Sequence, residues 1–234
     1  MVALRDVADS CSNRLVGLLP RRDYERLRAP SSAIGFVYFI ETGDGSLVNT
    51  IMHGDAAEVG TIGNEGIVGL PLLLQDDRAP TSVYVQVPGT GPRMKAAPFE
   101  KELARSATMR AVMPHYAHAF FNQVAQWAAC NQFHSLEQRC RRWLLMTHDR
   151  MHSDEFLLTQ EFLAMMLGLQ RTGVTAAAGA LQRAGLIRCT RGNVAILDRN
   201  GLKRRPCECD GISKREFDRL LGGRVLPKAL WDRI

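Results

Sequence analysis

Residues 157–187 read LLTQEFLAMMLGLQRTGVTAAAGALQRAGLI, and the pattern in this stretch decides the fold of the C-terminal half. It predicts two helices separated by a tight turn. Thr159 is placed to accept free amide hydrogen bonds at the start of the first helix. Gly168 is expected to end that helix, because glycine adopts the positive φ of a left-handed cap without strain. The buried face of the first helix is predicted to consist of Phe162, Leu163 and Met166.

The second helix is expected to run from residue 170 to residue 184. Val174, Ala178 and Leu181 recur at spacings of four and three, which places them on its inward face. Gly185 is expected to end this helix. Small residues along the helix keep it slim enough to enter a DNA major groove, which is roughly 12 Å wide.

A β-hairpin is predicted after the second helix, with strands at residues 186–190 and 194–197 joined by Arg191-Gly192-Asn193. A cap, a glycine turn, a polar helix start, a glycine stop and a basic hairpin in this order predict a winged helix-turn-helix. The alternative interpretation is a helical hairpin whose charged face is only solvated. The joint occurrence of all five features favours the DNA-binding interpretation.

The start of the second helix is expected to meet base edges, while the first helix and the hairpin rest on phosphates. Arg171 is the first candidate for base recognition, because its planar guanidinium can donate two hydrogen bonds to guanine O6 and N7. The residues predicted to contact duplex DNA are Thr159, Gln160, Gln170, Arg171, Thr172, Thr175, Arg188 and Arg191.

The distribution of charge supports this assignment. The chain carries a formal net charge of +6 over 234 residues. Residues 156–205 hold eight basic and two acidic side chains, a net of +6, whereas residues 31–98 hold three basic and seven acidic ones, a net of −4. A positive surface attracts nucleic acid when it is concentrated in one place, and the C-terminal segment meets that condition.

The N-terminal half has a different pattern. Residues 1–30 are predicted to form a helical cap of two short amphipathic helices that end before Pro30. Short runs rich in β-branched and aromatic residues then alternate with glycine, aspartate, asparagine and proline. These runs, FVYFI, SLVNTI, AEVGTI and SVYVQV, predict a compact antiparallel β-roll over residues 31–98.

Connecting helices are predicted over residues 99–134. They carry an apolar stripe, which is predicted to form the interface of a homodimer; the alternative is that it packs on the chain's own β-roll. The stripe consists of Val112, Tyr116, Phe120, Val124 and Trp127. Ser135 and Gln138 have the spacing of a capping box and predict the start of a further helix. Residues 135–205 are therefore assigned to the winged domain, and residues 206–234 to a C-terminal extension.

At this point the sequence resembles the Crp/Fnr family of bacterial regulators, typified by the cyclic AMP receptor protein. The likeness rests on TQEFLAMMLGLQRTGVT, on the long central helix and on the run GNEGIVGL at residues 63–70. It implies an α+β fold with an N-terminal antiparallel β-roll resembling a cyclic-nucleotide-binding domain. It also implies a long central dimerisation helix, a C-terminal winged helix-turn-helix, and a homodimer on a palindromic promoter site.

The effector does not follow from this resemblance. Cyclic-nucleotide binders of the family place a glutamate after the first glycine of the phosphate cassette to hold the ribose, but Ile67 follows Gly66 here. Cyclic AMP is therefore not expected. Arg78, Thr81 and Ser82 are the residues available to bind another anionic effector. Only residues 29–35 separate the expected helical cap from FVYFI, where the family usually has two more strands, so a shortened roll is expected.

No metal, cofactor or catalytic residue is predicted. Cys207-x-Cys209 provides two ligands where a closed zinc site takes about four, so free thiols are expected. A cupin-like metalloenzyme is the distant alternative, but His53 is the only histidine of the predicted roll. A constitutive DNA-binding protein whose roll is a scaffold is the nearer one.

The expected partners are double-stranded DNA, a second copy of the chain and RNA polymerase, with an effector of unknown identity. No apolar run approaches the roughly 20 residues of a membrane span, so a cytoplasmic protein without a membrane partner is expected.

Overall fold

Two four-stranded sheets make up the N-terminal half of the computed structural model, which describes residues 3–6, 26–28, 30–52, 54–150, 153–169, 171–190, 192–204 and 207–222. One sheet has the strand order β1-β8-β3-β6 and the other has the order β2-β7-β4-β5. Their bounds are β1 Ala3–Asp6, β2 Arg26–Arg28, β3 Phe36–Phe39, β4 Asp44–Thr50, β5 Ala56–Ile62, β6 Ile67–Val68, β7 Ser82–Val87 and β8 Thr90–Lys95. The four predicted runs are strands β3, β4, β5 and β7, so the β-roll is confirmed.

The N-terminal segment differs from the sequence prediction where the structure describes it. β1 pairs in parallel with β8, and β2 pairs antiparallel with β7. The helical prediction is therefore wrong at Arg26 and Leu27, and the rest of the two predicted helices lies outside the described residues. The expectation of a shortened roll is also wrong, because strands from before residue 30 extend both sheets.

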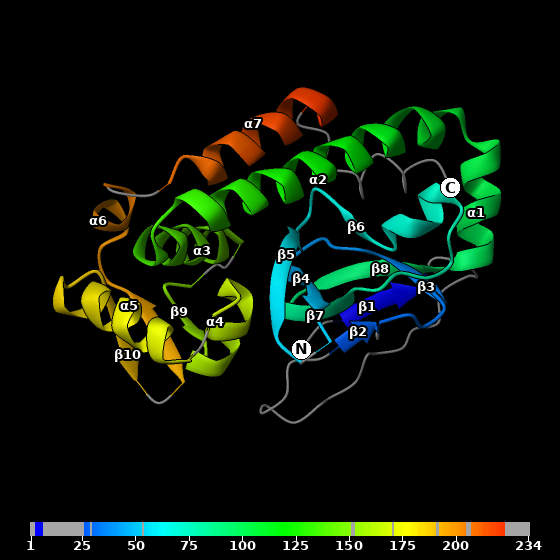
Figure 1. The fold of residues 1–234 in the computed structure, drawn as a ribbon. Helices are drawn as coiled ribbons and strands as arrows, with labels where there is room; N and C mark the ends of the chain where they lie inside the picture. The colour runs from blue at the N-terminus through cyan, green and yellow to red at the C-terminus, as the bar shows by residue number, and fades with distance from the viewer. Residues whose placement is uncertain are drawn as a thin grey trace.

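Helices follow the roll and lead into the C-terminal half (Figure 1). α2 runs along one side of the roll, and α7 lies along the side of α2 that faces away from the roll. None of the described helices has the length and apolar character needed to cross a bilayer. The helices are η1 Leu70–Leu74, α1 Ala96–Arg105, α2 Ala107–Phe133, α3 Leu136–Arg150, α4 Gln160–Leu167, α5 Arg171–Arg183, α6 Arg199–Lys203 and α7 Cys209–Leu221.

The predicted capping box opens α3. The Ser135 amide donates to Gln138 Oε1 at 3.0 Å, and the Gln138 amide donates to Ser135 Oγ at 3.3 Å. Two otherwise free amides at the helix start are thereby satisfied. The hinge between α2 and α3 is short, because α2 ends at Phe133 and α3 begins at Leu136.

The apolar stripe of α2 packs inside the chain and is not a free surface. Tyr116, Phe120 and Trp127 are buried, and Val112 and Val124 are half-buried against the core that α2 shares with the roll. The homodimer interface on this stripe stays a prediction, whereas the side chains of the stripe pack on the chain's own core, as the alternative holds. The physical reason is the close fit of α2 on the roll, together with α7, whose Phe217 and Leu221 enter the same core.

Two glycines of the roll permit this close fit. A Cβ built on Gly60 would lie 2.8 Å from Phe120 Cζ, and a Cβ built on Gly66 would lie 2.6 Å from Tyr116 Oη. Tyr116 Oη donates a hydrogen bond to the Ile67 carbonyl oxygen at 3.0 Å, so its ring is held against the backbone of the loop. The missing side chains at residues 60 and 66 therefore provide the space that the aromatic rings of α2 occupy.

A buried polar network joins the roll to α3. Ser46 Oγ lies 2.5 Å from both Glu58 Oε2 and Gln86 Oε1, and Gln86 Nε2 donates to Thr147 Oγ1 at 2.8 Å. Burial raises the pKa of Glu58 to about 7, although the hydrogen bond from Ser46 and the charges of Arg142 and Arg150 oppose that rise.

Arg150 also ties α3 to the roll. Its guanidinium lies 3.3 Å from Asp44 Oδ2 and 3.0 Å from Glu65 Oε1. Burial raises the pKa of Asp44, whose side chain is fully enclosed, while the charge of Arg150 lowers it. Three carboxylates of the roll thus face the basic side of one helix.

We predict that Gly66→Ala lowers the free energy of unfolding by about 1–3 kcal/mol, because the new methyl group displaces Tyr116. Chemical denaturation of the full-length protein measures this effect. Gly35→Ala is the matched control, since no atom lies within 4 Å of a Cβ built there. Equal stability of the two variants would show that the roll adjusts without cost.

We also predict that Glu58→Gln changes how stability depends on pH. The folded chain binds the Glu58 proton more tightly than the unfolded chain between pH 4.5 and about 7, so this group makes stability fall as pH rises through that window. The variant should gain on the wild type across the window, by up to on the order of 3 kcal/mol at its upper end. Denaturation at a series of pH values checks this, with the exposed Glu100→Gln as control. A difference that does not change with pH contradicts the prediction.

Candidate nucleic-acid interface

The first helix of the predicted pair is α4, and its caps are those read from the sequence. Thr159 Oγ1 accepts a hydrogen bond from the Phe162 amide at 3.1 Å. Gly168 closes the helix at φ 61°, in the left-handed region. The predicted inward residues Phe162, Leu163 and Met166 are buried. Thr159 and Gln160 stay exposed at the helix start, where phosphate contacts are expected.

The second helix is α5, which begins at Arg171 and is followed by Gly185 at φ 70°. Val174, Ala178 and Leu181 are buried as predicted. Thr172 and Thr175 are exposed on the opposite side. Gln170 and the side chain of Arg171 lie outside the described residues, so the predicted base contact of Arg171 stays a prediction.

The hairpin is present as β10 Ile187–Thr190 and β11 Asn193–Ile196, with Gly192 at φ 86° in the turn. A third strand, β9 Glu155–Leu157, pairs antiparallel with β11 and was not predicted. Arg188 is exposed on β10 and forms no ion pair with any described residue, which leaves its charge available to an outside anion. Arg191 lies outside the described residues.

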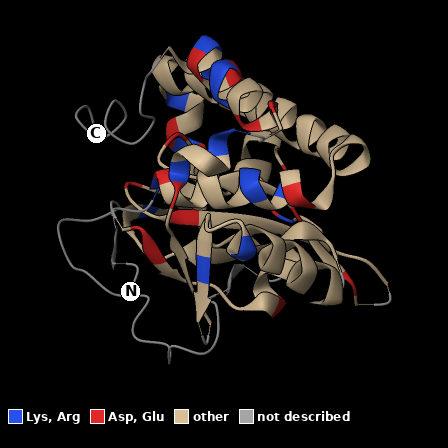
Figure 2. Cartoon of the chain, turned by 90° about the vertical axis from the view of Figure 1, so that its left-hand side faces the viewer, with Lys and Arg blue, Asp and Glu red and all other residues tan. Residues whose placement is uncertain are grey.

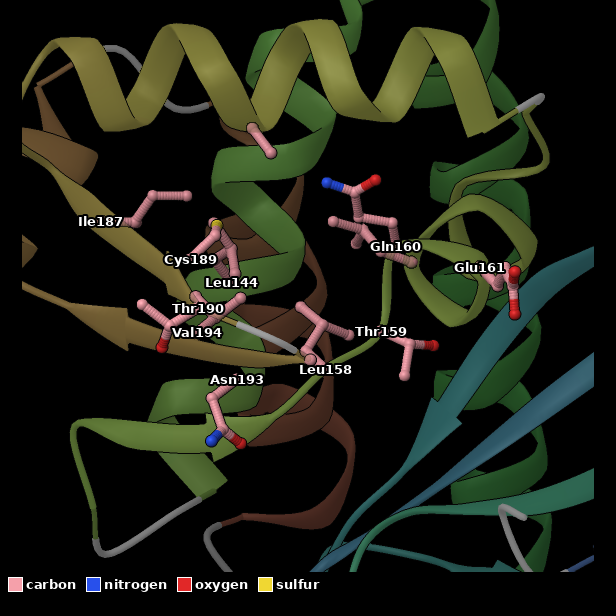
Figure 3. Close-up of a pocket in the computed structure, with 13 residues that line it drawn as sticks. Leu144, Leu158, Thr159, Gln160, Glu161, Ile187, Cys189, Thr190, Asn193 and Val194 are labelled. Carbon is pink, nitrogen blue, oxygen red and sulfur yellow. The ribbon is translucent and has the colours of Figure 1, made fainter. Parts of the chain in front are cut away.

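A pocket of about 520 Å³ separates the start of α4 from the wing (Figure 3). Gln160 and Thr190 both line it, and Thr175 Oγ1 donates to Gln160 Oε1 at 3.0 Å from α5. The structure therefore brings α4, α5 and the wing together at one surface. The lining residues are Leu144, Leu158, Thr159, Gln160, Glu161, Leu163, Ala178, Ile187, Cys189, Thr190, Gly192, Asn193 and Val194.

Ion pairs within the chain neutralise part of the positive charge that the sequence count assigns to the C-terminal half. Arg199 pairs with Asp149, and Arg204 lies 3.0 Å from Asp198. Figure 2 shows both basic and acidic residues on the helices of this side. The basic residues that remain exposed near the second helix, Arg188 among them, carry the electrostatic argument for a nucleic-acid partner.

The residues predicted to bind an anionic effector differ in how far they are exposed to solvent. Arg78 is exposed, donates to the Ser31 carbonyl oxygen at 3.3 Å and lies 3.7 Å from Asp77. Ser82 is only 2% exposed, at the start of β7, and Thr81 is half-buried. A ligand would reach Ser82 only after the roll rearranged.

One cluster was missed by the sequence analysis. Cys130, on the last turn of α2, and His134, the residue that caps this helix, lie beside Cys207 and Cys209, and the four potential ligand atoms are within 4.8 Å of one another. The ligand count of two was therefore too low, because the fold adds two potential ligands, and the expectation of free thiols stays a prediction. The four-residue spacing of Cys130 and His134 was the available signal, because it puts both on one helix face.

We predict that Thr159→Ala destabilises the winged domain by about 0.5–2 kcal/mol, because the Phe162 amide loses its acceptor. Thr159→Ser keeps the hydroxyl and should stay close to the wild type. Urea denaturation of the two variants measures the difference. Equal losses in both would assign the effect to the missing methyl group rather than to the cap.

Comparisons with known proteins agree with this geometry. Residues 138–205 match the model of the Crp-like helix-turn-helix domain. No curated protein sequence matches the chain. Among solved structures, a transcriptional regulator of the CRP family from Thermus thermophilus superposes with a TM-score of 0.64 at 18% identity, covering 80% of this chain and 94% of its own.

Two further structures show the same likeness. FixK2 from Bradyrhizobium japonicum gives a TM-score of 0.63 at 14% identity, with 80% and 94% of the two chains covered. A second regulator from Thermus thermophilus, of the CRP/FNR family, gives 0.58 at 20% identity, with 80% and 95% covered. Residues 138–205 thus form a Crp-like helix-turn-helix domain, in a chain that has the fold of the Crp/Fnr regulators.

Proposed function

We propose that this protein is a transcription regulator that binds duplex DNA in a sequence-specific manner through α4, α5 and the wing. The observation that carries the proposal is the polar start of α5, where Thr172 and Thr175 are exposed while Val174 is fully buried. A helix held from behind in this way presents its first turns outward, as a helix that reads the major groove must.

The residues around α5 include exposed groups that can donate hydrogen bonds to the phosphate backbone of DNA. Thr159 and Gln160 are exposed at the start of α4, and Arg188 is exposed on the wing. Hydroxyl, amide and guanidinium groups are the usual donors to phosphate oxygens, and such contacts fix the register of a protein on the duplex. In this proposal Arg171 reads bases, while Arg188 and Arg191 anchor phosphates.

The proposal includes a homodimer on a palindromic site, since a two-fold pair of these domains reads two half-sites. The α2 stripe is the predicted interface of this dimer, although its side chains also pack against the chain's own core. Light scattering of the free and DNA-bound protein gives the number of copies, and a symmetric footprint shows the palindrome. RNA polymerase is the further partner that a regulator of promoters would contact.

A constitutive regulator is the second version of the proposal. The burial of Ser82 and the contacts of Arg78 with Ser31 and Asp77 favour a roll that acts as a scaffold. DNA affinity that stays unchanged across candidate anionic effectors supports this version. A ligand that shifts the affinity supports an effector-responsive roll instead.

We predict different effects for the two kinds of arginine, measured by fluorescence anisotropy on a site recovered by genome-wide footprinting. Arg171→Ala should reduce the preference for that site over random duplex by about 1–3 kcal/mol. Arg188→Ala should weaken both complexes alike and lower the slope of log affinity against log salt by about one. Both effects follow from the separation of base and phosphate contacts.

Arg219→Ala is the matched control, because this exposed arginine lies on α7 and pairs with Glu216 at 2.8 Å. It should leave both affinities unchanged. Equal affinity of the unmodified protein for the recovered site and for random duplex would refute sequence-specific binding.

A further inference from the structure

Four side chains from two distant parts of the sequence meet where α7 begins beside the end of α2, and we refer to them as the cysteine–histidine cluster. Cys130 and His134 come from the end of α2, Cys209 is the first residue of α7, and Cys207 lies two residues before it. The three cysteines form a small buried cluster of their own, separate from the two large hydrophobic cores. His134 is half-buried beside them.

Two distances within the cluster are close to those of a tetrahedral zinc site, and all four potential ligand atoms lie within 4.8 Å of one another. With Zn–S bonds of about 2.3 Å and Zn–N bonds of about 2.05 Å, two sulfurs lie about 3.8 Å apart and a sulfur and a nitrogen about 3.6 Å apart. Cys130 Sγ and Cys207 Sγ are 3.6 Å apart, and Cys209 Sγ and His134 Nδ1 are 3.5 Å apart. A disulfide would need a sulfur separation of about 2.05 Å.

Neighbouring groups orient the cluster for an ion. Glu208 Oε2 lies 3.3 Å from His134 Nε2, which leaves Nδ1 facing the sulfurs, and a carboxylate in this position is the usual second partner of a zinc-binding histidine. Gln126 Nε2 donates to Cys209 Sγ at 3.2 Å. The Arg142 guanidinium stacks on the Trp127 ring at 4.3 Å.

We propose that the cysteine–histidine cluster binds one zinc ion, which ties the end of α2 to the segment that leaves the winged domain. Three thiolates and one imidazole in a closed tetrahedral set are the ligands of structural zinc sites. The position of the cluster in the chain indicates what the ion would do. The chain enters the winged domain at Ser135, directly after His134, and leaves it at Cys207, so one ion fixes the entry and the exit together.

Metal analysis of the full-length protein tests this proposal without reference to DNA binding. The protein, carrying no polyhistidine tag, is purified under reducing anaerobic conditions from zinc-supplemented cells and examined by mass spectrometry. The wild type should hold about one zinc ion per chain. Cys207→Ser and His134→Ala should lower the zinc content at least about tenfold, because each removes a ligand. His134→Cys restores a four-ligand set and should retain the ion.

Cys189→Ser is the matched control, since Cys189 is a partly buried cysteine of the wing outside the cluster. It should bind zinc as the wild type does. Removal of zinc with a chelator should lower the Tm of the wild type and of Cys189→Ser, and added zinc should restore it. If a ligand variant fails to fold, titration of the chelated wild type with zinc, followed by competition with a dye, still measures the site.

Three results would overturn the proposal. The first is a wild-type protein that neither retains zinc nor binds it after chelation. The second is an unchanged zinc content in soluble Cys207→Ser. The third is a disulfide between Cys130 and Cys207 in freshly purified anaerobic protein, which would assign the cluster to thiol oxidation. None of these results depends on whether the protein binds DNA, so the two proposals fail separately.

Discussion

The packing of α2 on the roll is the contact on which the rest of the molecule depends. Tyr116 and Phe120 lie against backbone at Gly66 and Gly60, at separations that leave no room for a Cβ. Because protein interiors are close-packed, this contact fixes both the distance and the rotation of α2. α3 follows α2 after a short hinge, and α7 packs along its outer side (Figure 1). The position of the winged domain is therefore set by a helix that touches the roll.

A second connection between the halves is polar. Asp44, Glu58 and Glu65 of the roll face Arg150 and Arg142 of α3, within a network that includes Ser46. Removing one member of a buried charged network leaves another without its partner, which costs more than the net value of the pair. The winged domain also contacts the roll directly, since a Cβ on Gly168 would lie 2.9 Å from Ala57 Cβ. The two halves are joined by apolar contacts, hydrogen bonds and ion pairs at once.

Local signals in the sequence were sufficient to predict the winged domain. They were insufficient to predict how α2 packs and where strands β1 and β2 lie. The Thr159 cap, the Gly168 turn and the Ser135 capping box depend on residues three or four apart, so a single stretch of sequence contains the whole argument. The stripe of α2 depends instead on what covers it. Its periodicity shows that Tyr116 and Phe120 are buried, but the covering residues are glycines about 50 to 60 positions away. The short strands β1 and β2 had no such pattern of their own, because the partners that define them are β8 and β7.

The cysteine–histidine cluster was also missed because it depends on residues far apart in the sequence. Neither pair of potential ligands is a metal site alone. Cys130 and His134 share a helix face, and Cys207 and Cys209 are two residues apart, but the fold brings the pairs together only where α7 returns along α2. The return also adds a polar contact, in which Asn122 Nδ2 of α2 donates to Glu216 Oε2 of α7 at 2.9 Å. The described part of the C-terminal extension, residues 207–222, thus packs on the central helix through α7. Under the two proposals, a winged domain held by zinc at both its entry and its exit would have fewer orientations to lose when it docks on DNA, which would reduce the entropic cost of binding.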